Sequence, residues 1–133
     1  MRAVAGTQTR GLPQGARLHC ADNSGAKVIE IVTVLKYKGV KRRSPSAAIG
    51  EMVVASVKKG TPEMRRELVH AVIVRCRRAF RRSDGTMVQF EDNAAVVLKD
   101  EKGNPKGTIF KGPISKEAAQ RWPSVAKVAK MVL

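Results

Sequence analysis

Aromatic side chains are scarce in this sequence, at 4% of the 133 residues. Proteins that bind single-stranded nucleic acid without sequence preference stack the bases on several aromatic side chains. The aromatic residues here are too scattered to suggest such a platform: Tyr37, Phe80, Phe90, Phe110 and Trp122. We therefore expect a nucleic-acid partner to be recognised through its phosphates and its folded shape.

Long apolar runs are also missing, and none approaches the roughly 20 residues that a helix needs to cross a bilayer. Residues 1–15 lack the apolar centre of a signal peptide. The basic residues fall mostly in strand-like segments, which does not suit a basic amphipathic helix on a membrane surface. The two cysteines, Cys20 and Cys76, are isolated among apolar neighbours. These features predict reduced thiols, a cytoplasmic location and no membrane partner.

Motifs for catalysis and nucleotide binding are absent. The sequence has no G-x-x-x-x-G-K-[ST], no G-x-G-x-x-G and no G-x-S-x-G. A metal site can be imagined from His19, Cys20 and Asp22, with His70 in addition, but the C-x-x-C and H-x-x-x-H spacings are lacking. We expect a core or barrel-end role for His70. The sequence predicts no enzyme, no metal, no cofactor and no small-molecule substrate.

Positive charge is what the sequence has in excess, with 26 Lys and Arg residues against 11 Asp and Glu residues and a net charge of +15. A domain this basic repels itself when alone, which favours a polyanionic partner. Two stretches lack acidic residues altogether, one between Glu30 and Glu51 and the other between Glu67 and Asp84. Their cations are Lys36, Lys38, Lys41, Arg42 and Arg43 in the first stretch, and Arg75, Arg77, Arg78, Arg81 and Arg82 in the second.

The arginines of the second stretch can grip phosphate oxygens two at a time. For any single residue, a solvated strand end explains the charge equally well. For the two stretches together, phosphate contact is the better explanation. Lys58 with Lys59, and Arg65 with Arg66, form weaker clusters, and we expect Glu63 and Glu67 to offset the second partly.

Alternating and β-branched segments predict a mainly β fold. Five to seven strands joined by tight turns favour a closed barrel. In the segment 68–78, Val74 and Cys76 are predicted on a buried side, with Arg75 and Arg77 on a wet one. The expected strands span residues 17–21, 27–36, 52–57, 68–78, 86–90 and 94–99.

The C-terminal part changes character. Ser115 can cap a helix over 116–120, and Pro123 can begin a second helix over 124–131. We predict a single domain over residues 1–133. It comprises an irregular lead-in at 1–15, a β-barrel with its ribbon at 16–112, and short helices at 113–133.

Several motifs resemble those of the L-fourteen family, a universal protein of the large ribosomal subunit. The matching segments are Ala21-Asp22-Asn23-Ser24-Gly25-Ala26-Lys27, Val57-Lys58-Lys59-Gly60 and the stretch from Ala71 to Leu98, with Gly107, Gly112-Pro113 and Glu117 also in place. The resemblance covers nearly the whole chain from about residue 15 onward. The lead-in, the segment 59–66 and Gln120-Arg121-Trp122-Pro123 differ from the bacterial pattern and favour the archaeal and eukaryotic branch, with an archaeal source preferred.

The resemblance implies a five-stranded β-barrel, a projecting β-ribbon and a short helical C-terminal segment. It implies binding to large-subunit ribosomal RNA on the face that meets the small subunit, with bridges to small-subunit ribosomal RNA. It also implies neighbouring large-subunit proteins, the third and the twenty-fourth among them. Carried over by position, the RNA contacts are Lys58, Lys59 and the arginines from Arg75 to Arg82, while the Asp22-Asn23 and Asp92-Asn93 pairs form turns.

Two other hypotheses remain open on the sequence alone. A free-standing barrel could act as a chaperone or regulator of single-stranded RNA, which would require an aromatic stacking face. A metal-dependent RNA-processing enzyme would require a metal at His19, Cys20 and Asp22.

Overall fold

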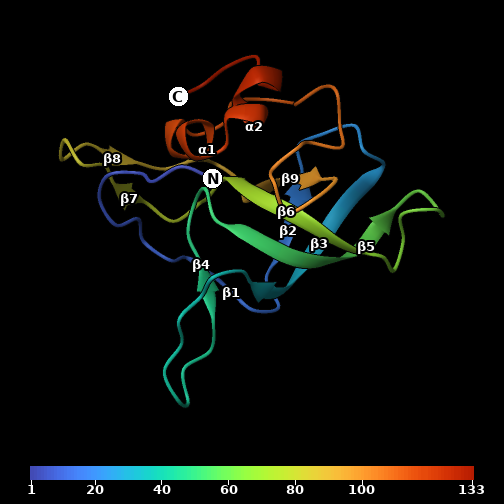
Figure 1. The fold of residues 1–133 in the computed structure, drawn as a ribbon, viewed down its shortest axis with the longest axis horizontal. Coiled ribbons are helices and arrows are strands. Elements are labelled where there is room, and N and C mark those ends of the chain that lie inside the picture. The colour runs from blue at the N-terminus through green and yellow to red at the C-terminus, as the bar shows by residue number, and fades with distance from the viewer.

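The computed structural model describes all residues from 1 to 133, and its centre is a closed five-stranded barrel (Figure 1). The strand order is β2-β3-β5-β6-β9, and all neighbours are antiparallel except β9 and β2, which close the barrel in parallel. The barrel strands are β2 Arg17–Cys20, β3 Ala26–Val34, β5 Met52–Gly60, β6 Leu68–Arg75 and β9 Ala94–Leu98. The predicted mainly β barrel is confirmed.

Alternation along the strands fills the barrel interior. In β3, Ile29 and Ile31 point inward and are fully buried, and Val53 and Ala55 of β5 join them in one apolar core. β-branched residues favour such pleated, half-buried segments. The alternating apolar residues that predicted the strands are therefore the residues that fill the barrel interior.

Strand β6 differs from its prediction because both of its faces are buried. Ala71 and Ile73 face the barrel interior, while Val72 and Val74 lie in a second core beneath the C-terminal segment. The register shifts between Ile73 and Arg75, and Cys76 beyond it belongs to the interior core. The predicted wet face of this strand is wrong, and so is the placing of Val74 and Cys76 on one side.

Two short helices cover this second face, at the top of the view in Figure 1. Helix α1 spans Lys116–Arg121 and α2 spans Pro123–Val128. The predicted cap is confirmed, because the Ser115 hydroxyl accepts a hydrogen bond of 3.2 Å from the Ala118 amide. Pro123 occupies the start of α2, as its missing N–H allows. Neither helix is long and apolar enough to span a bilayer.

Two small ribbons stand outside the barrel. Strands β7 Phe80–Arg81 and β8 Met87–Val88 pair as a hairpin that projects at the left of Figure 1. Its turn contains Gly85 at a φ of 90°, a left-handed conformation that glycine adopts without strain. Within the predicted lead-in, β1 Leu12–Pro13 pairs with β4 Ser46–Ala47, and Leu12 is buried in the barrel core.

Candidate nucleic-acid interface

The strand register assigns the basic segments to the two ends of the barrel. The start of β5 lies beside the end of β3 and the end of β6, and the end of β6 lies beside the start of β9. The loop 35–51 and the segment 76–93 therefore leave the same end, which carries Lys41–Arg43 and Arg77–Arg82. The opposite end carries the turn 21–25 and the loop 61–67, next to Lys58 and Lys59. Figure 1 shows the loop 35–45, the β7–β8 ribbon and the loop 61–67 as three separate protrusions.

The first protrusion carries Lys41, Arg42 and Arg43, which are all exposed. None of the three lies within ion-pair distance of a carboxylate, since the six ion pairs of the structure involve other residues. Arg42 has a φ of 69°, an uncommon left-handed conformation for a residue other than glycine. The tip of this loop thus presents three unpaired cations to solvent.

The segment 76–93 contains arginines of two kinds. Arg77, Arg78 and Arg81 are exposed and form no ion pair. Arg82, in contrast, donates from Nε to Glu117 Oε1 of α1 at 2.8 Å and from Nη2 to the carbonyl oxygen of Leu133 at 2.6 Å. Only the first three side chains are free to reach a partner.

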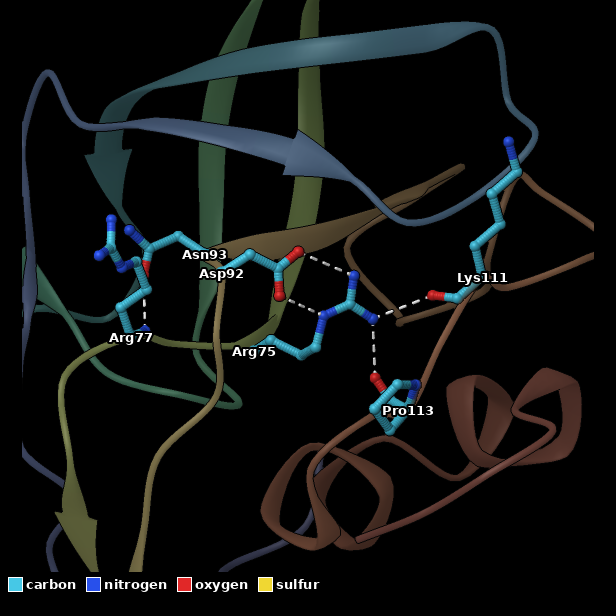
Figure 2. Close-up of polar contacts among 6 residues, drawn as sticks. All are labelled: Arg75, Arg77, Asp92, Asn93, Lys111 and Pro113. Carbon is cyan, nitrogen blue, oxygen red and sulfur yellow. Dashed lines mark hydrogen bonds and ion pairs between the residues drawn. The ribbon is translucent and has the colours of Figure 1, made fainter.

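Arg75 is held entirely within the protein (Figure 2). Its guanidinium donates to both carboxylate oxygens of Asp92, at 2.9 and 3.2 Å. Its Nη1 also donates to the carbonyl oxygens of Lys111 and Pro113, at 2.9 and 2.8 Å. The side chain is 11% exposed. This planar fork joins three segments of chain, which is a structural task.

Lys58 and Lys59 lie with two further cations around a shallow hollow at the other end of the barrel. The hollow is lined by Lys27, Lys58, Lys59, Gly60 and Arg65, and no carboxylate lines it. Lys58 Nζ is 3.9 Å from Glu30, which also pairs with Arg17. Sequence reasoning did not select Lys27. Only the strand register places it here, because β3 pairs with β5 and Lys27 precedes Val28, the partner of Lys59.

The turn 21–25 has a structural role. Buried Asp22 accepts hydrogen bonds from the Val97 amide and the Ser24 hydroxyl, both at 2.8 Å. Burial raises the pKa of its carboxyl group despite these hydrogen bonds. Asn23 accepts from the amides of Thr108 and Ile109 and so fixes the next loop. Burial, followed by the charge of Asp22, raises the pKa of the neighbouring Cys20 thiol to about 12.

The aromatic residues and the candidate metal ligands are not arranged as the single-stranded-RNA and metal-enzyme hypotheses require. Phe80, Phe110 and Trp122 are buried, so they offer no face to a base. No three His, Cys, Asp or Glu side chains form a group that could hold a metal ion. His70 lies with Nε2 at 3.4 Å from Glu101 Oε1, which gives it a side-chain partner at the barrel surface.

Comparison with known proteins decides the family. The model of ribosomal protein L14p/L23e matches residues 11–133. The chain belongs to this family. It is 54% identical to large ribosomal subunit protein uL14 of Methanococcus vannielii, over 99% of both chains. It is 53% identical to the protein of the same name from Thermoplasma acidophilum, over the full length of both.

Family membership confirms the resemblance, and these relatives agree with the archaeal branch. The protein is a structural component of the large subunit in the cytoplasmic ribosome, and it is not an enzyme.

Proposed function

We propose that this large-subunit protein binds large-subunit ribosomal RNA through the basic loops at both ends of its barrel. The rigid barrel would fix where the loops emerge, and their cations would neutralise phosphates where RNA helices crowd together. Release of counterions would drive the association, so the affinity should fall steeply as the salt concentration rises.

The observation that carries this proposal is the hollow formed by Lys27, Lys58, Lys59 and Arg65, which no carboxylate lines. Four exposed cations at such close quarters repel one another in the isolated protein. A polyanion that enters the hollow turns this repulsion into attraction. The unpaired side chains of Lys41–Arg43, Arg77, Arg78 and Arg81 at the other end support the same function.

The proposal extends to the partners that the family resemblance implies. The protruding loops would reach the small-subunit ribosomal RNA and contribute to the interface and bridges between the subunits. The third and twenty-fourth large-subunit proteins would be neighbours. The alternative of a free-standing barrel on single-stranded RNA is less well supported, because three of the aromatic side chains are buried.

Arg77, Arg78 and Arg81 allow a direct test, because all three are exposed and lack an intramolecular partner. We expect their joint replacement by Ala to weaken incorporation into the large subunit and to leave the barrel folded. Co-sedimentation on sucrose gradients at low and high salt measures incorporation, and circular dichroism measures folding. A matched variant replaces Lys116, Lys127 and Lys130, three exposed cations of the C-terminal segment, by Ala and should incorporate normally. Unchanged incorporation of the triple variant would refute the assignment of these arginines.

A further inference from the structure

The hairpin between β5 and β6 contains a β-bulge. The regular ladder ends with Ser56 opposite Leu68. The next residue, Val57, faces two residues, because its carbonyl accepts from the Arg66 amide and its amide donates to the Glu67 carbonyl, both at 3.0 Å. In this type of bulge the first residue adopts a left-handed conformation and is usually glycine.

Arg66 occupies that first position, with a φ of 66°. A left-handed backbone is strained for a residue with a Cβ, so arginine is an unfavourable choice there. Its side chain is exposed and forms neither a hydrogen bond nor an ion pair within the protein. The Arg66 side chain therefore makes no polar contact that stabilises the fold, and glycine would adopt this backbone conformation with less strain.

The loop that carries Arg66 is firmly attached to the barrel. The Thr61 amide donates to the Gly25 carbonyl at 3.0 Å, and the amides of Met64 and Arg65 donate back to the Thr61 carbonyl. Met64 is 5% exposed and packs into the barrel core. The basic side chains at 65 and 66 thus project from a fixed backbone, which lowers the entropy lost when a ligand binds.

The charge of this loop continues the basic hollow described above. Arg65 lines that hollow and also a second, adjacent one with Pro62 and Arg66. Sequence reasoning expected Glu63 and Glu67 to offset the charge of these arginines, but neither glutamate forms an ion pair. The two hollows together bring five cations to one end of the barrel: Lys27, Lys58, Lys59, Arg65 and Arg66.

We propose that these five side chains form one cradle for consecutive phosphodiesters of folded RNA, with Arg66 kept at the strained bulge position for its phosphate contact. This inference rests on the proposed RNA-binding function and specifies one site within it. The cradle ligand is backbone phosphate, so the contact should strengthen binding without selecting a base sequence.

Because the backbone at Arg66 is strained, a substitution there should affect RNA binding and thermal stability differently. Arg66→Gly and Arg66→Asn both suit a left-handed backbone. The probe is an in vitro transcript of large-subunit RNA from Methanococcus vannielii, in filter binding over a range of chloride concentrations. For each variant, the slope of log affinity against log salt should become shallower by roughly 0.7–0.9, the contribution of one phosphate contact. The midpoint of thermal unfolding should stay the same or rise.

Each other outcome has a defined meaning. If the salt slope is unchanged and the unfolding midpoint rises, Arg66 does not contact RNA. If the slope becomes shallower and the unfolding midpoint also falls, Arg66 has a structural role. Either result overturns the cradle. Lys127→Ala, which removes one exposed charge from α2, should leave the slope unchanged, and an equal effect there would also overturn it. If inorganic phosphate at constant ionic strength stabilises the wild type while the Arg66 variants keep the wild-type salt slope for RNA, the site binds the free ion and the RNA assignment is wrong. If the wild type itself binds this RNA no better than an unrelated duplex, the proposed function fails.

Discussion

At the scale of one residue, Arg75 shows that an arginine in a basic segment can stabilise the fold and leave no donor for a ligand. Four hydrogen bonds join its guanidinium to Asp92 and to the carbonyls of Lys111 and Pro113 (Figure 2). We expect Arg75→Ala to lower the free energy of unfolding by about 2–3 kcal/mol, since hydrogen bonds to a charged group are lost and two carbonyls are left unpaired. Arg75→Lys should restore only part of this, because an ammonium cannot match the planar fork. Urea unfolding measures both.

Arg77→Ala is the matched control, because this exposed neighbour uses only its backbone amide, which donates to Asn93. Its unfolding free energy should stay within about 0.5 kcal/mol of the wild type, as for most surface substitutions. Equal losses for Arg75→Ala and Arg77→Ala would contradict a special structural role for Arg75.

Sequence reasoning grouped Arg75 with its neighbours for a physical reason. A run of arginines shows how much charge a segment carries, and the partners of Arg75 lie 17 to 38 residues away in the chain. Only the folded topology shows that its guanidinium is already bound to Asp92 and to two backbone carbonyls. Arg77, Arg78 and Arg81 are exposed, as expected for charged residues near strand ends. The sequence could not separate them from Arg82, whose partner Glu117 lies 35 residues further along the chain.

At the scale of elements, Arg82 and Glu117 attach the β7–β8 ribbon to helix α1. The Glu117 side chain is 7% exposed, and its second carboxylate oxygen is buried without a hydrogen-bond partner. Removing one member of a buried pair leaves an uncompensated charge, so Arg82→Ala should cost about 3–5 kcal/mol of unfolding free energy. Hydrogen exchange of the α1 and ribbon amides should show both elements opening more often.

Glu117→Gln and the double variant complete a thermodynamic cycle for this pair. Because the glutamine leaves no stranded charge, Arg82→Ala should be less harmful in the Glu117→Gln background than in the wild type. Additive effects would show that the two elements are not coupled through this contact.

The elements themselves were largely predictable, and the exceptions have a common cause. The strands, the Ser115 cap and the closed barrel follow from local patterns. The second buried face of β6 does not, since Val72 and Val74 are covered by Ile114, Trp122 and Val125 from the far end of the chain. A strand pattern cannot indicate which distant segment will cover it.

At the scale of the whole molecule, strands β6 and β9 are shared between two apolar cores. Ile73 and Val97 belong to the barrel interior, while Val74 and Val96 pack under the C-terminal helices. Neither core can open without exposing one face of the same two strands. The net charge of +15 acts against both cores together, because repulsion between cations falls when the chain expands.

Trp122 gives a direct test of whether the 133 residues form one cooperative unit, as the single-domain prediction requires. This residue is the single tryptophan, is 3% exposed, and donates from Nε1 to the Gly50 carbonyl at 2.8 Å. Its fluorescence therefore reports on the C-terminal segment, whereas far-ultraviolet circular dichroism reports mainly on the strands. We expect the two urea transitions to coincide, since the shared strands couple the cores. An earlier fluorescence transition would show that the C-terminal segment separates from a barrel that stays folded. Added salt should move both transitions together to higher urea, because it screens the excess positive charge.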